Sequence, residues 1–221
     1  MTALLRYIKK SREQFHDRHY HASDFHNKMY SGGTFSTWKE TRKILKQYCS
    51  GLTLDAGSGG GAWHATILKF TNEYESIEIA PRGDHVPTWL GDITNMSAIP
   101  SERYDTVFCQ QVLKHVPQPF EAVREINRVL KPGGKLIMTV PHLSKRHELP
   151  HDYYRYTQNG LRYIFENSEF DVAYIAGYGG IIPFLHHQAS FIFTEPCNGV
   201  LDGSDTRYSG KHAVFTFNGI S

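Results

Sequence analysis

The chain has 221 residues, 40% of them hydrophobic and 21% charged, which suits one globular domain with a modest extension. The formal net charge of +2 is too small to indicate a nucleic-acid partner by itself. No apolar run approaches the roughly 18 residues that suggest a membrane span, and the first residues form no signal peptide. Three scattered cysteines without a CxxC pair favour a reducing compartment, so we expect a cytoplasmic protein with no membrane partner.

Residues 1–50 are polar and favour helices, so we expect an N-terminal helical extension. Its clearest helix follows Thr37, which forms a capping-box pattern with Glu40, and should end at Gly51. The extension also holds four histidines, but their His-x-x-His-x-His spacing matches no reliable zinc pattern and no cysteine accompanies them. We therefore expect no metal site at His16, His19, His21 and His26.

From residue 52 onward, short apolar stretches alternate with helical patterns. The clearest helix follows Phe120 and has one apolar stripe, which Lys131, Pro132 and two glycines should stop. Strands that alternate with helices favour an α/β fold with a doubly wound, mostly parallel, seven-stranded sheet. The expected strands are 52–57, 74–80, 87–92, 104–110, 135–141, 171–177 and 212–219, and the expected helices include 62–70, 120–134 and 157–170.

The segment TLDAGSGGGAW, residues 53–63, places one aspartate before a run of glycines, at the end of the first expected strand. Backbone without side chains can turn tightly and approach a ligand closely. Ligands of doubly wound sheets bind at the carboxyl ends of the strands, where the strand order reverses. We therefore expect the loop to hold a nucleotide-like cofactor.

Several segments between residues 52 and 179 resemble, in the right order, the motifs of class I S-adenosylmethionine-dependent methyltransferases. DAGSGGG at 55–61 resembles the family's glycine loop, and Glu78 follows Gly57 by 21 residues, where the family keeps an acidic residue. The resemblance implies a Rossmann-like methyltransferase domain over 51–221, an N-terminal lid over 1–50, and S-adenosyl-L-methionine as the cofactor. Further segments that resemble family motifs are 91–93, 104–116 and 124–141.

The resemblance also implies roles for particular residues. Asp55 would accept a hydrogen bond from the cofactor's ammonium group, directly or through water, and Glu78 would accept from both ribose hydroxyls. Asp92 would accept from the adenine amino group, while Ile79 and the Ile93 backbone enclose the ring. The expected cofactor-binding residues are Asp55, Gly57, Ser58, Gly59, Glu78, Ile79, Asp92, Ile93 and Gln110.

Other interpretations of these motifs stay open. A glycine loop of this kind also occurs in nicotinamide-dependent enzymes, although the position of Asp55 and the LKPGG run fit them less well. The three acidic residues could also be plain surface carboxylates. Only 13 residues separate Glu78 from Asp92, where many family members have a whole helix, so a loop should wall the adenine side of the pocket.

Residues 142–156 are too many for a plain connection, and we expect them to form an acceptor loop. The sequence PHDYYRYT, at 150–157, resembles a bacterial branch of the family that is linked to glycan or secondary-metabolite pathways. Because an imidazole can take a proton from a hydroxyl at neutral pH, the candidate catalytic bases are His142 first, then His151 and His115. The residues expected to contact the substrate are Tyr20, Tyr30, Gln111, Asp152, Tyr153 and Tyr154.

Two of these roles have plainer alternatives. Asp152 either orients one of the loop histidines or pairs with Arg155, with the tyrosines packing the loop down. His115 is either a base or a structural residue at the start of a helix.

The sequence predicts a methyltransferase acting on O or N of a polar small molecule, with a sugar-bearing compound or a secondary metabolite as examples. An RNA or protein methyltransferase is the alternative among enzymes, although no Asn/Asp-Pro-Pro-aromatic motif follows the fourth strand, so we expect no nucleic-acid partner. A non-catalytic, cofactor-binding partner protein is the alternative from another class. The acceptor and the oligomeric state are not determined by these motifs.

Overall fold

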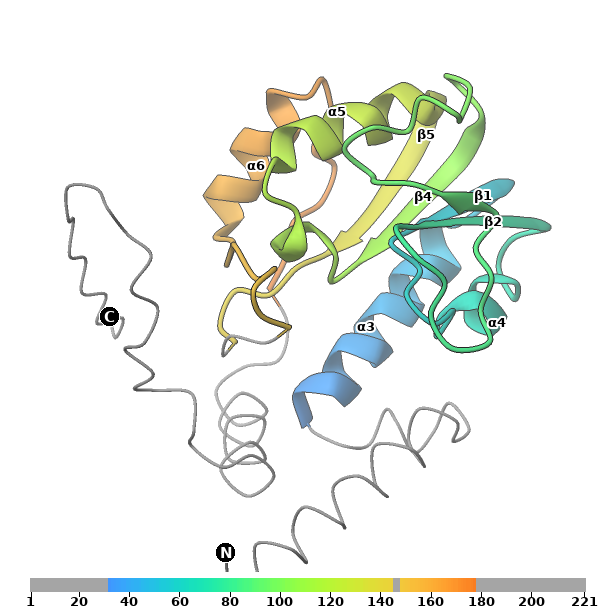
Figure 1. Cartoon of the computed structure of the whole chain (residues 1–221). Coiled ribbons are helices and arrows are strands. Elements are labelled where there is room, and N and C mark those ends of the chain that lie inside the picture. The colour runs from blue at the N-terminus through green and yellow to red at the C-terminus, as the bar shows by residue number, and fades with distance from the viewer. Residues whose placement is uncertain (1–31, 145–147, 178–221) are drawn as a thin grey trace, which may run out of the picture.

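The computed structural model describes residues 32–144 and 148–177, and its described strands form one sheet (Figure 1). The strand order is β3-β2-β1-β4-β5, and all four pairings are parallel. This confirms the expected α/β architecture with a parallel sheet. The strands are β1 Leu52–Ala56, β2 Glu73–Glu78, β3 Trp89–Leu90, β4 Tyr104–Gln110 and β5 Leu130–Thr139.

Helices cover both faces of the sheet (Figure 1). On one face lie α3 (Gly32–Tyr48) and the short α4 (His64–Ile67), and on the other lie α5 (Pro119–Val129) and α6 (Gln158–Glu166). A 3₁₀ turn, η1 (Leu113–His115), joins β4 to α5. The chain therefore has the three-layer arrangement of a doubly wound fold. Within the described residues, no helix has the length and apolar character to cross a bilayer.

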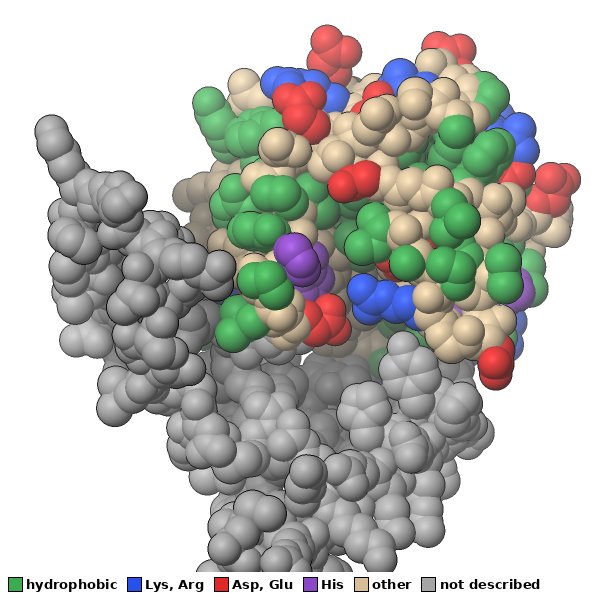
Figure 2. Space-filling view, in the orientation of Figure 1, with side chains coloured by type: hydrophobic (Ala, Val, Ile, Leu, Met, Phe, Trp, Pro, Cys, Tyr) green, Lys and Arg blue, Asp and Glu red, His purple; other side chains and the backbone are tan. Residues whose placement is uncertain are grey.

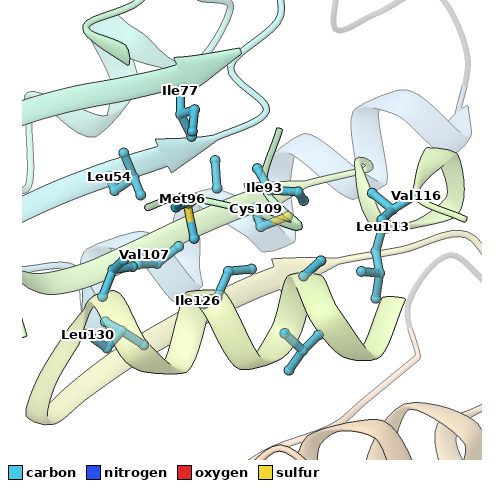
Figure 3. Packing of buried hydrophobic residues seen from close by; sticks show 14 of the residues in the cluster. Leu54, Ile77, Ile93, Met96, Val107, Cys109, Leu113, Val116, Ile126 and Leu130 are labelled. Carbon is cyan, nitrogen blue, oxygen red and sulfur yellow. The ribbon is translucent and has the colours of Figure 1, made fainter. Parts of the chain in front are cut away.

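The larger hydrophobic core lies between the sheet and α5 (Figure 3). Ile126 projects from α5 toward the sheet, where Leu54 and Val107 belong to the two central strands, and all three side chains are fully buried. A second cluster joins Leu45 of α3 to Phe108 on the opposite face of β4. Alternate residues of β4 thus serve opposite cores, as the two-residue period of a strand requires.

The first helix differs from its sequence prediction. It begins at Gly32, so Thr37 lies inside the helix and is not its N-cap. Glu40 instead forms a 2.8 Å ion pair with Lys43, one turn along the exposed face. Gly51 follows the helix with φ +64°, and a Cβ there would lie 2.6 Å or less from the Asp105 side chain, so this turn requires glycine. The capping-box prediction was therefore wrong, because the helix extends further toward the N-terminus.

Several boundaries in the rest of the sheet also differ. Residues 171–177 form no helix or strand, so the predicted sixth strand is wrong, and 212–219 lies outside the described residues. Strand β5 begins at Leu130, directly after α5, so the LKPGG run that we assigned to the helix end belongs to the strand. Helices α4 and α6 are shorter than predicted. The sequence pattern therefore predicted which segments are helices and strands more accurately than it predicted their first and last residues.

The strand order defines where a ligand should bind. β1 pairs with β2 on one side and with β4 on the other, so the order of the strands reverses between β1 and β4. The glycine loop follows β1, and Gln110 ends β4. In folds of this type the crevice outside these strand ends holds the ligand.

A polar cluster on the strands, centred on Glu75 of β2, holds three strands together. Its carboxylate accepts hydrogen bonds from Tyr104 Oη (2.6 Å) and Trp89 Nε1 (2.9 Å), and pairs with the Arg103 guanidinium. The Arg103 hydrogen bonds, with those of Tyr104 and Trp89, lower the pKa of Glu75 to about 2, against the opposing effect of burial.

We expect Glu75→Gln to lower the free energy of unfolding at pH 7 by about 1.5–3 kcal/mol, since a charged hydrogen-bonded group is lost. A carboxyl whose pKa is depressed stabilises the fold above its unfolded pKa, near 4.3, and this contribution is lost as the pH falls toward 2. Urea unfolding should therefore give similar free energies of unfolding for wild type and Glu75→Gln below pH 4. Glu121→Gln, which removes an exposed ion pair with Arg124, is the control and should change stability by less than about 1 kcal/mol.

Candidate cofactor and acceptor site

The glycine loop is fixed beneath the end of β2. The backbone N–H groups of Gly57 and Ser58 both donate to the Ile77 carbonyl, at 2.9 and 3.2 Å. Gly57 has φ +79°, and a Cβ there would lie 2.5 Å from a methyl group of Val112. Only glycine fits at this position, because both the backbone conformation and the neighbouring side chain exclude a Cβ.

Glu78 lies at the end of β2, and its carboxylate faces the loop. One oxygen accepts from Gly59 N at 2.7 Å and the other from Ile79 N at 3.0 Å. The side chain is buried, with 8% of the residue exposed. Two backbone donors thus fix the orientation of the carboxylate, and each oxygen keeps a lone pair for a further donor.

Asp55 is enclosed within the sheet layer below the loop. Its Oδ2 accepts from the Tyr74 hydroxyl on β2 at 2.9 Å. Burial raises the pKa of Asp55 to about 7, the Tyr74 hydrogen bond opposes this, and the charge of Glu78 adds to it. A cation placed beside this carboxyl would therefore favour its ionised form.

Residues 79–88 form a loop, as the short spacing predicted, and this loop folds back onto the glycine loop. His85 Nε2 lies 3.1 Å from Ser58 Oγ and 3.4 Å from Ser76 Oγ. A Cβ on Gly61, which has φ +74°, would lie 2.7 Å from His85 Nδ1. No sequence motif predicted a role for His85. The sequence offered one signal for it, a histidine in the short segment between Glu78 and Asp92, where many family members have a helix.

The three residues expected around adenine differ in how far they are exposed. Ile93 belongs to the hydrophobic core and is 5% exposed, so only its backbone can face a ligand. Ile79 is 65% exposed and leaves an apolar surface next to Glu78. Asp92 is exposed, and its Oδ1 accepts from Thr94 N at 2.8 Å in a local turn.

Gln110 ends β4, and Gln111 follows it directly. Gln110 Oε1 accepts from Trp63 Nε1 at 2.8 Å, which leaves the amide NH₂ as a donor. Gln111 has φ +60°, an uncommon conformation for a residue with a side chain, and its N–H donates to the Thr139 carbonyl at 2.8 Å. The strand therefore ends in a fixed, strained turn beside β5.

His142, the first candidate for the base, is held through one of its ring nitrogens. Its Nδ1 lies 2.9 Å from the Tyr156 carbonyl oxygen, which can only accept, so Nδ1 carries the proton. In the neutral ring, Nε2 then has a free lone pair. Tyr156 is itself held, since its N–H donates to the Pro141 carbonyl and its hydroxyl to the Leu113 carbonyl. The base candidate therefore rests on a rigid part of the acceptor loop.

The other loop residues are held mainly by one another. Arg155 binds both oxygens of Asp152, at 2.7 and 2.8 Å, so the structure has the arrangement that we gave as the alternative to Asp152 orienting a histidine. His115 Nδ1 contacts the His151 carbonyl at 2.5 Å and its Nε2 lies 3.7 Å from Glu148. These contacts fasten the acceptor loop to η1.

A hollow of about 360 Å³ lies between the loop and the start of α5. Aromatic rings and prolines form much of its wall, and Tyr153 and Tyr154 beside it are 45% and 37% exposed. Sequence analysis predicted the tyrosines but not the contribution of α5. The residues lining the hollow are Pro117, Gln118, Pro119, Phe120, Glu121, Tyr154, Tyr156 and Ile164.

Two sets of predicted residues lie outside the described residues. These are Tyr20 and Tyr30, expected to contact the substrate, and the four histidines of the extension. Among residues 32–144 and 148–177, no group of three or more His, Cys, Asp or Glu side chains is placed to hold a metal ion.

Comparisons with known proteins agree with this geometry. Residues 54–138 match the family described as a methyltransferase domain. The ubiquinone biosynthesis O-methyltransferase of Xanthomonas euvesicatoria pv. vesicatoria (strain 85-10) is 30% identical over 98 residues, which are 39% of this chain and 41% of that protein. Its counterpart in Proteus mirabilis (strain HI4320) is 28% identical over 105 residues, 42% of this chain and 43% of that protein. The chain thus aligns with less than half the length of these curated relatives.

Solved structures share the fold at low sequence identity. A SAM-dependent methyltransferase from Aquifex aeolicus superposes with a TM-score of 0.53 at 18% identity, covering 63% of this chain and 84% of that chain. The CurJ carbon methyltransferase superposes with a TM-score of 0.51 at 16% identity, covering 68% of this chain and 52% of that chain. By fold, the described chain is a doubly wound domain with a cofactor loop at its switch point. Its central segment, residues 54–138, is similar to the methyltransferase domain family.

Proposed function

We propose that the whole protein transfers the methyl group of S-adenosylmethionine to an oxygen or nitrogen of a polar small molecule. The observation that carries the proposal is the pairing of the glycine loop with the Glu78 carboxylate at the switch point of the sheet. The family match over 54–138 supports it. The curated relatives are O-methyltransferases of ubiquinone biosynthesis, which favours a small-molecule acceptor and an oxygen nucleophile.

In this proposal the cofactor lies across the strand ends. Glu78 accepts from the two ribose hydroxyls, because its two oxygens are fixed side by side by Gly59 N and Ile79 N. The exposed Ile79 side chain would offer an apolar surface to adenine, and Asp92 would accept from its amino group. Asp55 balances the charge of the ammonium group, directly or through water, from below the loop.

The chemistry asks little of the protein beyond alignment and one proton transfer. Bound S-adenosylmethionine would supply a methyl group on a positively charged sulfur, open to in-line attack by the acceptor, with S-adenosylhomocysteine as the leaving group. Gln110 and Gln111 flank this position at the end of β4. For a hydroxyl acceptor, His142 Nε2 takes the proton, and its protonated ring is stabilised by the Tyr156 carbonyl.

Two other functions remain as alternatives to be tested. On the face shown in Figure 2, acidic and basic side chains of the described residues are interspersed, which favours a small molecule over RNA as the acceptor. A non-catalytic SAM-binding partner would need no base, and the candidate base His142 on the loop after β5 counts against it. The expected cytoplasmic location stays a prediction from the sequence, with the cysteine pattern as one of its grounds.

A methyl-transfer assay with labelled S-adenosylmethionine tests the function. The acceptors should be a panel of small phenols, alcohols and amines, with transfer RNA and a histone-like basic peptide as the alternatives. We expect S-adenosylhomocysteine to form only with members of the small-molecule panel. Transfer to the RNA or the peptide instead, or cofactor binding with no transfer to anything, would contradict the proposal.

The buried Asp55 carboxyl gives a pH-dependent prediction. Its folded pKa, about 7, lies above its unfolded value, near 3.9, so the folded protein binds an extra proton between these values. The stability of the ligand-free wild type should therefore fall by a few kcal/mol as the pH rises from about 4 to about 7. Asp55→Asn should be more stable than wild type at pH 8 while binding S-adenosylmethionine more weakly. Urea unfolding at several pH values and calorimetry measure the two effects, and a variant less stable at pH 8 would refute the assignment.

A further inference from the structure

Lys114 is a buried cation on the acceptor side of the crevice. It lies in η1, just after Gln110 and Gln111, and only 5% of the residue is exposed. Its backbone carbonyl accepts from Tyr153 N at 2.8 Å and from Tyr154 N at 3.3 Å. The residue is therefore enclosed between the end of β4 and the acceptor loop.

The ammonium group of Lys114 has few partners. Nζ lies 3.4 Å from Gln111 Oε1, a weak contact with a neutral group. No carboxylate among residues 32–144 and 148–177 forms an ion pair with it, and no other hydrogen bond from Nζ to them is present. A buried charge without a counter-charge is costly, so sites of this kind commonly serve to bind something.

The nearest acidic side chains do not remove this imbalance. Asp152 binds Arg155 with both of its oxygens, and Glu148 lies beside His115. Burial, together with the Arg155 charge, lowers the pKa of Lys114 to about 8, and the charges of Glu148 and Asp152 only partly oppose this. Near neutral pH the group is thus still mainly a cation, and an added negative charge would stabilise it.

Gln111 links Lys114 to the neighbouring strand end. Its Nε2 donates to Thr139 Oγ1 at 3.3 Å, and its backbone is held in the left-handed region at φ +60°. Strained backbone of this kind is maintained where surrounding structure holds it, often at functional sites. Lys114, Gln111 and Thr139 form a chain of one cation and two neutral polar groups across the ends of β4 and β5.

We propose that Lys114 binds a carboxylate of the methyl acceptor, so that the substrate is a small organic acid. One compact ammonium group with neutral polar neighbours suits a single negative charge, whereas a phosphate usually needs several charged or backbone donors. The exposed rings of Tyr153 and Tyr154 beside it suit an aromatic acid. The inference rests on the proposed function, since it identifies the substrate class of the same site.

Matched pairs of acids and amides test this inference by calorimetry. Benzoate and 3,4-dihydroxybenzoate are compared with benzamide and 3,4-dihydroxybenzamide, each titrated into the full chain with and without S-adenosylhomocysteine. We expect at least one carboxylate to bind at least about 10-fold more tightly than its amide, as the loss of a charge-assisted hydrogen bond implies. Lys114→Met should weaken that carboxylate about 10- to 150-fold, and Lys114→Arg should weaken it less.

The control is Lys43→Met, which removes an exposed lysine on α3 and should leave carboxylate binding unchanged. Affinity for S-adenosylhomocysteine reports separately on the proposed function and should be the same in all four proteins. Binding of neither carboxylate, equal binding of acids and amides, or full carboxylate affinity in Lys114→Met would overturn the inference. The comparison of acids with amides on the wild type decides the matter even if Lys114→Met fails to fold.

Discussion

Replacing His142 by alanine is expected to lower kcat for a hydroxyl acceptor by about 100-fold or more, because general-base help contributes about 10²–10⁴ in rate. The structure gives His142 a fixed tautomer, since Nδ1 donates to the Tyr156 carbonyl and leaves Nε2 as the proton acceptor. Cofactor affinity should stay unchanged, because the side chain belongs to the acceptor loop. Initial rates at saturating cofactor, together with calorimetry, measure both quantities.

His142→Asn is the sharper variant of this experiment. An asparagine NH₂ can still donate to the Tyr156 carbonyl but cannot take a proton at neutral pH, so it separates a base from a loop anchor. The variant should lose as much kcat as His142→Ala, and His151→Gln should lose much less. Wild-type rates for His142→Asn would show that the proton leaves by another route, with His115 the next residue to replace.

Glu78→Ala is expected to weaken S-adenosylmethionine binding by about 10- to 150-fold. Hydrogen bonds to a charged group are worth about 1.5–3 kcal/mol, and the carboxylate would accept one from each ribose hydroxyl. The same change also frees Gly59 N from its 2.7 Å partner, which loosens the glycine loop. Calorimetric titration of both proteins gives the ratio directly.

Glu78→Gln separates these two contributions. The amide keeps one oxygen that can accept from Gly59 N, but it loses the charge and one of the two acceptors. Its affinity should lie between those of wild type and Glu78→Ala. Glu121→Gln, on the exposed surface of α5, should bind like wild type. Wild-type affinity in Glu78→Ala would remove Glu78 from the cofactor site.

The sequence predicted the parts of the site that depend on short-range chemistry. Residue types after the first strand predicted the glycine loop, and the family resemblance pointed to Glu78. The structure joins the two through Gly59 N. Strand β4 matched its predicted bounds because a buried central strand is bordered by clear polar signals. The sequence pattern could not distinguish β5 from the end of α5, because LKPGG suits a helix stop as well as a strand start.

The remaining features depend on contacts between distant parts of the chain. His85 reaches Ser58 across 27 residues, and the hollow brings α5 together with the acceptor loop. In the sequence, Lys114 was only one residue of the 104–116 motif. The fold shows that it is buried, and that the nearby Asp152 carboxylate pairs with Arg155 and not with Lys114. No local pattern encodes such juxtapositions, because they arise from the packing of the whole domain.

Titration of the wild-type protein with S-adenosylmethionine in a calorimeter tests the central claim most directly. The account predicts saturable binding of one cofactor per chain, competition by S-adenosylhomocysteine, and a loss of about 10- to 150-fold in Glu78→Ala. No saturable heat from either compound, with a folded protein confirmed by its urea unfolding transition, would contradict the account.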